Sequence, residues 1–82
     1  MTEQARRHIL TITLLCIERA SLLLSDAADE LSSPKGSPAG AQLEVRAAIA
    51  YTERVNALLD VLTDYTIRDS LTTTQTHATS HE

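Results

Sequence analysis

Both prolines and both glycines of this 82-residue chain lie in one stretch of ten residues, SPKGSPAGAQ at positions 33–42. Pro34 cannot continue a helix, and it pushes the residue before it out of the helical region, so a first helix must end just ahead of it. Ser37 followed by Pro38 is a preferred helix start, with serine as N-cap and proline as first helical residue. We therefore expect the chain to reverse direction once, through a loop at residues 33–37.

The apolar residues before this loop recur with the spacing of a helix face. A first row with four- and three-residue steps consists of Leu10, Leu14, Ile17, Ser21, Leu24, Ala28 and Leu31. A second row, beside the first, consists of Ile9, Thr13, Cys16, Ala20, Leu23 and Ala27. Together the two rows cover about 200° of the helix surface, which is wider than one helical partner can cover.

The residues after the loop follow the same pattern. Their apolar row consists of Ala48, Tyr51, Val55, Leu58, Leu62 and Tyr65. Two helices of matched length, joined by a short connection, favour an antiparallel hairpin. The expected fold is all-α, with residues 1–70 forming one two-helix hairpin whose helices span about 3–32 and 38–69. Residues 71–82 are rich in threonine and poor in apolar residues, so we expect a disordered tail there.

A two-helix hairpin has a single seam, and a domain needs two packed layers to close a core. Two copies related by a two-fold axis would form a four-helix bundle, and the alternative is a hairpin that completes its core on a different protein. The homodimer is the favoured prediction. The predicted partner or dimer interface consists of Leu10, Leu14, Ile17, Leu24, Tyr51, Val55, Leu58, Leu62 and Tyr65.

Three further residues stand out against the helical pattern. Leu15 and Leu22 lie seven residues apart on the otherwise polar side of the first helix. They are either two isolated exposed leucines or a docking ridge for another helix. Arg54 borders the apolar row of the second helix, where it can pair with an acid of the facing helix or form a surface salt bridge.

The net charge bears on which partners the protein binds, and the single cysteine bears on its cellular compartment. Seven basic residues face eleven acidic ones, for a net charge of −4, so neither nucleic acid nor an anionic membrane is an expected partner. A lone Cys16 excludes an internal disulfide and favours a reducing cytoplasm. The stretch RRHILTITLLCI imitates an export signal, but Glu18 and Arg19 follow where small residues and a cleavage site belong, so no membrane insertion is expected.

No arrangement of reactive residues predicts catalysis or a metal site. His77 and His81 have the H-x3-H spacing of zinc ligands on a helix, but no rigid third ligand accompanies them. Cys16 lies within the apolar arc, where a thiol behaves as a small hydrophobe. The acids at the end of the first helix are Asp26, Asp29 and Glu30, which lie toward the polar arc without a pocket to desolvate them. We expect no enzyme activity, no cofactor and no metal.

Two stretches, ASLLLSDAADEL at 20–31 and YTERVNALLDVL at 51–62, resemble the paired helices of short uncharacterised bacterial proteins. In those proteins an alanine- and serine-rich helix precedes a loop and a helix with a VNxxLD element. The resemblance implies a compact helical module, with no activity and no functional residues to transfer.

The sequence therefore predicts a small intracellular protein–protein interaction module, such as an adaptor, an anti-regulator or a chaperone-like subunit, acting through apolar helix faces. The alternative is a small helical enzyme or ligand-binding bundle with a site at a dimer cleft that uses Arg54 and carboxylates. A nucleic-acid-associated regulator is the third hypothesis.

Overall fold

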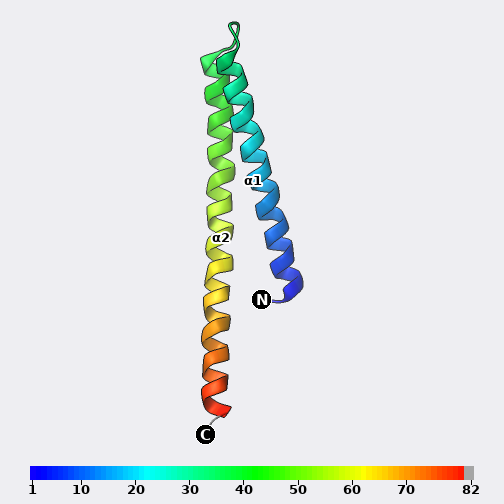
Figure 1. The fold of residues 1–82 in the computed structure, drawn as a ribbon, viewed down its shortest axis with the longest axis vertical. Helices are drawn as coiled ribbons and strands as arrows, with labels where there is room; N and C mark the ends of the chain where they lie inside the picture. The colour runs from blue at the N-terminus through cyan, green and yellow to red at the C-terminus, as the bar shows by residue number, and fades with distance from the viewer. Residues whose placement is uncertain (81–82) are drawn as a thin grey trace.

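The computed structural model describes the backbone of residues 1–80 and the side chains of residues 1–68. Two helices, α1 (Glu3–Ser32) and α2 (Pro38–Ser80), make up this part of the chain. They run antiparallel and are joined at one end by a short loop (Figure 1). The predicted all-α helical hairpin is confirmed, and the bounds of α1 and of the loop coincide with those expected from the positions of Pro34 and Pro38.

A hydroxyl side chain caps the start of each helix. Thr2 Oγ1 accepts a hydrogen bond from the backbone N–H of Ala5 at 3.0 Å. Ser37 Oγ accepts one from the backbone N–H of Gly40 at 3.2 Å, which is the N-cap role that the Ser-Pro pair predicted. These contacts satisfy amide groups that have no partner within the first turn of a helix.

The loop is closed by contacts to the last turn of α1. Glu30 Oε1 accepts a hydrogen bond from the backbone N–H of Ser37 at 2.7 Å, and the N–H of Gly36 donates to the carbonyl of Ser33 at 3.0 Å. The backbone at Gly36 passes so close to α1 that a Cβ there would overlap the carbonyl oxygen of Glu30. Gly36 is therefore required by a close approach of two backbone segments, and not by a left-handed φ angle.

The contact between the helices, here called the seam, buries mostly small side chains. Its buried members are Thr13, Cys16, Ala20 and Ala27 of α1 and Ala41, Ala48 and Val55 of α2. The hydroxyl of Thr13 donates to the carbonyl of Ile9 at 2.7 Å, so this buried polar group has a partner. Among the described side chains, no large one is fully buried. The seam therefore holds the two backbones close together but encloses little apolar volume.

Side-chain size also explains why the two helices diverge. Figure 1 shows α1 and α2 close together at the loop and farther apart toward the N-terminus of α1. Near the loop the seam residues are Ala27 and Ala41, whereas the half-buried Leu58 and Leu62 lie toward the open end. Because the separation of packed helices follows the side chains at their contact, the hairpin opens as those residues become larger.

The end of α2 differs from the sequence prediction. The helix continues to Ser80, whereas the predicted helix ended at 69 and was followed by a disordered tail over residues 71–82. Residues after Gly40 include neither proline nor glycine, and the low helix propensity of threonine is too small to act as a stop signal. Residues 81–82, and the side chains from 69 onward, lie outside the described part.

The two loop-end glycines provide a matched test of this geometry. Gly36→Ala is expected to destabilise the hairpin by about 1–3 kcal/mol, because the added methyl group forces the loop away from α1. Gly40→Ala is expected to stabilise it by about 0.5–1 kcal/mol. The nearest atom to a Cβ at Gly40 would be the flexible Glu30 Oε1 at 3.5 Å, an ordinary contact. Urea denaturation followed by circular dichroism, at one protein concentration, measures both changes. Equal effects of the two substitutions would contradict the close approach at Gly36.

Candidate interaction surface

Only one of the two apolar rows of α1 is used in the seam. The second row supplies the buried residues Thr13, Cys16, Ala20 and Ala27, and the first row is left largely in solvent. In that first row Leu14 is 59% exposed and Leu24 is 50% exposed. One partner helix thus covers one face of α1 and leaves a second apolar face without a neighbour.

Exposed apolar residues of α2 continue this surface. One shallow groove on α2 is lined by Ile49, Thr52, Val55 and Leu59, together with Glu53 and Asn56. A second groove brings Ile17, Ser21 and Leu24 of α1 together with Thr52 and Val55 of α2. Because the two grooves share Thr52 and Val55, the surface is continuous across both helices. We call it the apolar face: Leu10, Leu14, Ile17, Ser21, Leu24, Ala28 and Leu31 of α1 and Val45, Ile49, Thr52 and Leu59 of α2.

The two sides of the hairpin differ in chemistry. The residues of the apolar face are uncharged, and Glu53, which lines the first groove, lies at its border. The helical period places Arg19, Asp26 and Arg54 on the opposite side of the seam, which we call the polar side. Leu15 and Leu22 also belong there, and they are 58% and 56% exposed. Their role as a docking ridge stays a prediction.

The residues predicted for the interface occupy two different environments. The four from α1, which are Leu10, Leu14, Ile17 and Leu24, belong to the apolar face. Those from α2 lie against α1: Val55 is buried in the seam with an exposure of 8%, and Tyr51, Leu58 and Leu62 are half-buried. Tyr65 lines a small pocket with Met1, Glu3 and Arg6 at the open end.

Sequence reasoning missed the α2 part of the apolar face as a candidate interface. Val45, Ile49, Thr52 and Leu59 follow a row of their own, beside the row that faces α1. Their helical spacing was the available signal. The row that begins at Ala48 predicted the α2 interface instead, because it is longer and its three- and four-residue steps alternate regularly.

Charge pairs do not hold the two helices in register. Among the described side chains, the ion pairs are Glu3–Arg6 at 3.8 Å, Glu3–Arg7 at 3.3 Å and Asp64–Arg68 at 3.3 Å, each within one helix and exposed. Exposed pairs of this kind contribute only a few tenths of a kcal/mol. Neither pairing expected for Arg54 is present in this part of the chain, and Arg54 instead lines a shallow groove with Ala47, Ala50 and Tyr51.

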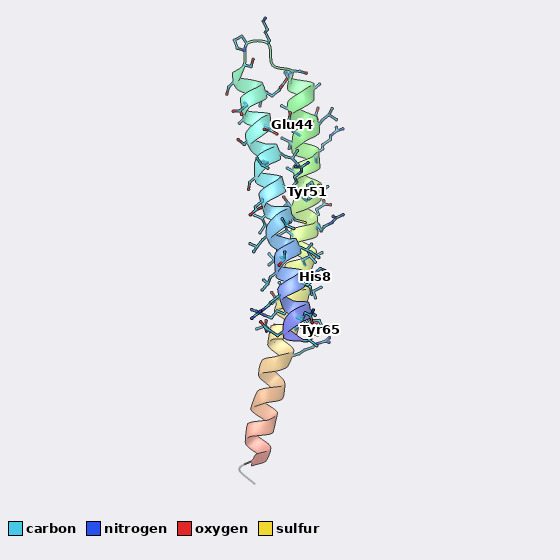
Figure 2. The ribbon with its side chains drawn as sticks, turned by 90° about the vertical axis from the view of Figure 1, so that its right-hand side faces the viewer. His8, Glu44, Tyr51 and Tyr65 are labelled. Atoms are coloured by element: carbon cyan, nitrogen blue, oxygen red, sulfur yellow. The ribbon has the colours of Figure 1, made fainter. Side chains whose placement is uncertain are left out.

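One carboxyl group is poorly accommodated at the loop end. Figure 2 labels Glu44 on α2 near the loop, above Tyr51 and Tyr65. Its Oε2 atom is buried and has no hydrogen-bond partner. Burial, followed by the negative charges of Asp26, Glu30 and Asp29, raises the pKa of the Glu44 carboxyl above its ordinary value. The acids that the sequence placed at the end of α1 therefore oppose ionisation of a residue on the facing helix.

The other groups considered for chemistry are separate from one another. Cys16 is buried in the seam with an exposure of 6%, and His8 is exposed on α1 (Figure 2). The side chains of His77 and His81 lie outside the described part. Within the described residues, no group of three or more His, Cys, Asp and Glu side chains is placed to hold a metal ion.

By length and composition alone, α1 could cross a membrane. An 18-residue window of α1 has a mean hydropathy of 1.5, and 17% of that window is buried in the hairpin. The core helices of soluble proteins and signal sequences meet the same criterion. Every window of this length in Glu3–Ser32 includes Glu18 and Arg19, and a charge at the centre of a bilayer costs about 2.5–3.5 kcal/mol. The predicted cytoplasmic location stays a prediction.

No protein-family model, curated protein or solved structure matches this chain. The resemblance of residues 20–31 and 51–62 to short bacterial helical hairpins stays a prediction as well.

The raised pKa of Glu44 predicts a change of stability with pH. A carboxyl that binds its proton more tightly in the folded chain stabilises the fold at low pH, and this contribution is lost as the pH rises through the folded-state pKa. Glu44→Gln, which cannot ionise, is therefore expected to match the wild type near pH 4 and to exceed its stability increasingly toward pH 7.

Urea midpoints measured between about pH 4 and pH 8 test this expectation. Glu53→Gln, at an exposed glutamate of the same helix, is the matched control, because it removes the same carboxyl group away from Asp26, Asp29 and Glu30. Parallel profiles for wild type and Glu44→Gln would contradict the proposed electrostatic penalty.

Proposed function

We propose that this protein is a small protein–protein interaction module whose hairpin folds stably only when another polypeptide covers its apolar face. The observation that carries the proposal is the apolar surface formed by both helices, with Leu14, Leu24 and Leu31 each at least half exposed. Contiguous apolar surface of this kind on a soluble chain marks a site of protein contact. An intracellular adaptor, anti-regulator or chaperone-like subunit acts through such a surface.

The exposed area of the hairpin supports this proposal. A compact monomer of 8.9 kDa exposes about 4,800 Å². The hairpin exposes 6448 Å², so it carries an excess of about 1,600 Å². Much of the excess belongs to the stretch of α2 that extends past α1, and the exposed leucines and isoleucines of the apolar face contribute to the remainder.

The energetics point the same way. Full burial of one leucine or isoleucine side chain is worth about 1.5–3 kcal/mol relative to its exposure. The seam is built largely from alanine, which offers much less apolar area per residue. Several large side chains, such as Leu14, Leu24 and Ile49, lie on the apolar face, so covering that face adds substantially to the stabilisation that the seam provides. Folding and association are therefore expected to be coupled.

The alternative of a ligand-binding site at Arg54 has weaker support. An acid facing Arg54 across a cleft would favour it. The groove at Arg54 is lined by Ala47, Ala50 and Tyr51, with no carboxylate in its lining. Leu15 and Leu22, on the polar side, are a candidate second contact site for a further partner.

Leu24 and Leu22 provide a matched pair for testing the proposal, because they are 50% and 56% exposed in the single hairpin. If the apolar face is covered in the folded state, Leu24→Asp buries an unpaired charge and is expected to cost about 3 kcal/mol or more. Leu22→Asp, on the polar side, is expected to change stability by less than about 0.5 kcal/mol.

Thermal melts at protein concentrations from about 1 to 100 µM, combined with light-scattering mass, measure these effects. If the covering polypeptide is a second copy of the chain, the melting temperature of the wild type rises with concentration and Leu24→Asp abolishes the cooperative transition. A wild-type chain that melts cooperatively as a monomer at the lowest concentration would contradict the proposed function.

A further inference from the structure

Arg54 belongs to a further row of residues on α2. The row advances by alternating steps of four and three residues, which is the spacing of a helix that packs lengthwise against another helix. We call it the Arg54 row: Leu43, Ala47, Ala50, Arg54, Ala57 and Val61. The helical period places this row on a different side of α2 from Val45 and Ile49. The Arg54 row is therefore a surface separate from the apolar face.

The hairpin leaves most of the Arg54 row in solvent. Leu43 is 66% exposed and Val61 is 40% exposed, and Ala50 and Ala57 are exposed as well. The shallow groove at the middle of the row has a volume of about 280 Å³ and is lined by Ala47, Ala50, Tyr51 and Arg54. A small molecule in so shallow a groove would stay largely in water. A second helix is the better match, because the alanines allow its backbone to approach closely.

Arg54 has no acidic partner in the hairpin. The residues three and four positions away on the same helix are uncharged: Ala50, Tyr51, Ala57 and Leu58. Among the described side chains, the ion pairs involve other arginines. A helix packed on the row would take Arg54 out of water, and a buried charge without a partner is strongly destabilising. The covering helix must therefore supply a carboxylate, which a guanidinium binds through two parallel hydrogen bonds.

Charged residues beside the row specify more of the partner. The flank that lies away from α1 carries Arg46, Glu53 and Asp60 at intervals of seven residues. Charges at flanking positions of packed helices select the partner and its register, because each favours the opposite charge across the interface. A matching helix therefore has acids opposite Arg46 and Arg54, and bases opposite Glu53 and Asp60.

The same charges disfavour other occupants. A parallel pairing of two copies of the row sets Arg54 against its own copy, and an antiparallel pairing centred on the row sets the two about one turn apart, so both pairings bring like charges together. Glu53 and Asp60 at the flank disfavour an anionic lipid surface. One arginine in an apolar row supplies too few cations to bind a phosphate backbone.

We infer that a helix of a different protein docks along the Arg54 row, with a carboxylate side chain paired to Arg54. This contact goes beyond the proposed function, because it uses another side of α2 and leaves the apolar face free for its own partner. Within the described side chains no carboxylate lines the groove, so Arg54 is available to an acid from outside the chain.

A designed helical peptide of about four heptads is the probe. Alanine and leucine face the Arg54 row, glutamate lies opposite Arg46 and Arg54, and lysine lies opposite Glu53 and Asp60. Two further peptides have glutamine or arginine in place of the glutamate opposite Arg54. Each sequence is made for parallel and for antiparallel docking and carries fluorescein. Fluorescence anisotropy at about 0.15 M salt measures the binding of each peptide to the full chain.

Reversal of the charge on both sides provides the decisive comparison. Arg54→Glu is expected to weaken binding of the glutamate peptide at least about tenfold, and to bind the arginine peptide within about threefold of the original affinity. Arg7→Glu is the matched control, because it changes the net charge equally at an exposed arginine of α1. It is expected to change the affinity less than about twofold. Circular dichroism establishes that each variant is as helical as the wild type.

The other outcomes overturn the inference. They are equal binding of the glutamate and glutamine peptides, or no binding of the glutamate peptide at about 1 mM. Tighter binding of a single-stranded oligonucleotide or of phosphatidylglycerol vesicles, lost in Arg54→Glu, would show that the ligand is a phosphate and also overturns it.

The test also separates this inference from the proposed function. For a purified chain that is unfolded alone, helix gained with the glutamate peptide and not with the glutamine peptide supports the inference, and equal or no gain overturns it. A cooperatively folded monomer that shows the charge-reversal pattern contradicts the proposed function and leaves this inference standing.

Discussion

The close contact of small side chains along the seam is the constraint on which the rest of this structure depends. Alanines at positions 20, 27, 41 and 48 let the two backbones approach, but they bury little apolar area. Several of the leucines and isoleucines that could form a larger core, including Leu14, Leu24 and Ile49, lie on the apolar face instead. In a chain of this length, a hairpin held by so thin a contact is marginal, and in the proposed function another polypeptide completes its core at the apolar face.

The loop end adds an electrostatic feature to this arrangement. Pro34, Gly36 and Pro38 reverse the chain so tightly that the last turn of α1 and the first turns of α2 lie together. This proximity brings three carboxylates of α1 near Glu44 of α2. The acids are unfavourable for the hairpin, because their negative charges oppose ionisation of the Glu44 carboxyl.

The apolar face and the polar side of the hairpin have different roles in the proposed function. The apolar face carries the exposed leucines and isoleucines that suit contact with another helical layer. The polar side carries Arg19, Asp26 and Arg54, with Leu15 and Leu22 among them. A mixed surface of this type suits contacts that form and dissociate. The hairpin thereby combines a surface for assembly with a separate surface that remains open to solvent.

The sequence by itself determined the helices, the loop and the single reversal of the chain, because Pro34 and the Ser37–Pro38 pair act through local backbone geometry. It also indicated that α1 has more apolar surface than one helix can cover. Only the tertiary structure decided which of the two rows of α1 faces α2. Both rows have the same periodicity, and the row of smaller side chains lies inside because it permits the closer approach of the backbones. The end of α2 was not predictable for a related reason: the part of the helix after Gly40 includes neither proline nor glycine, so it has no local signal for where the helix stops.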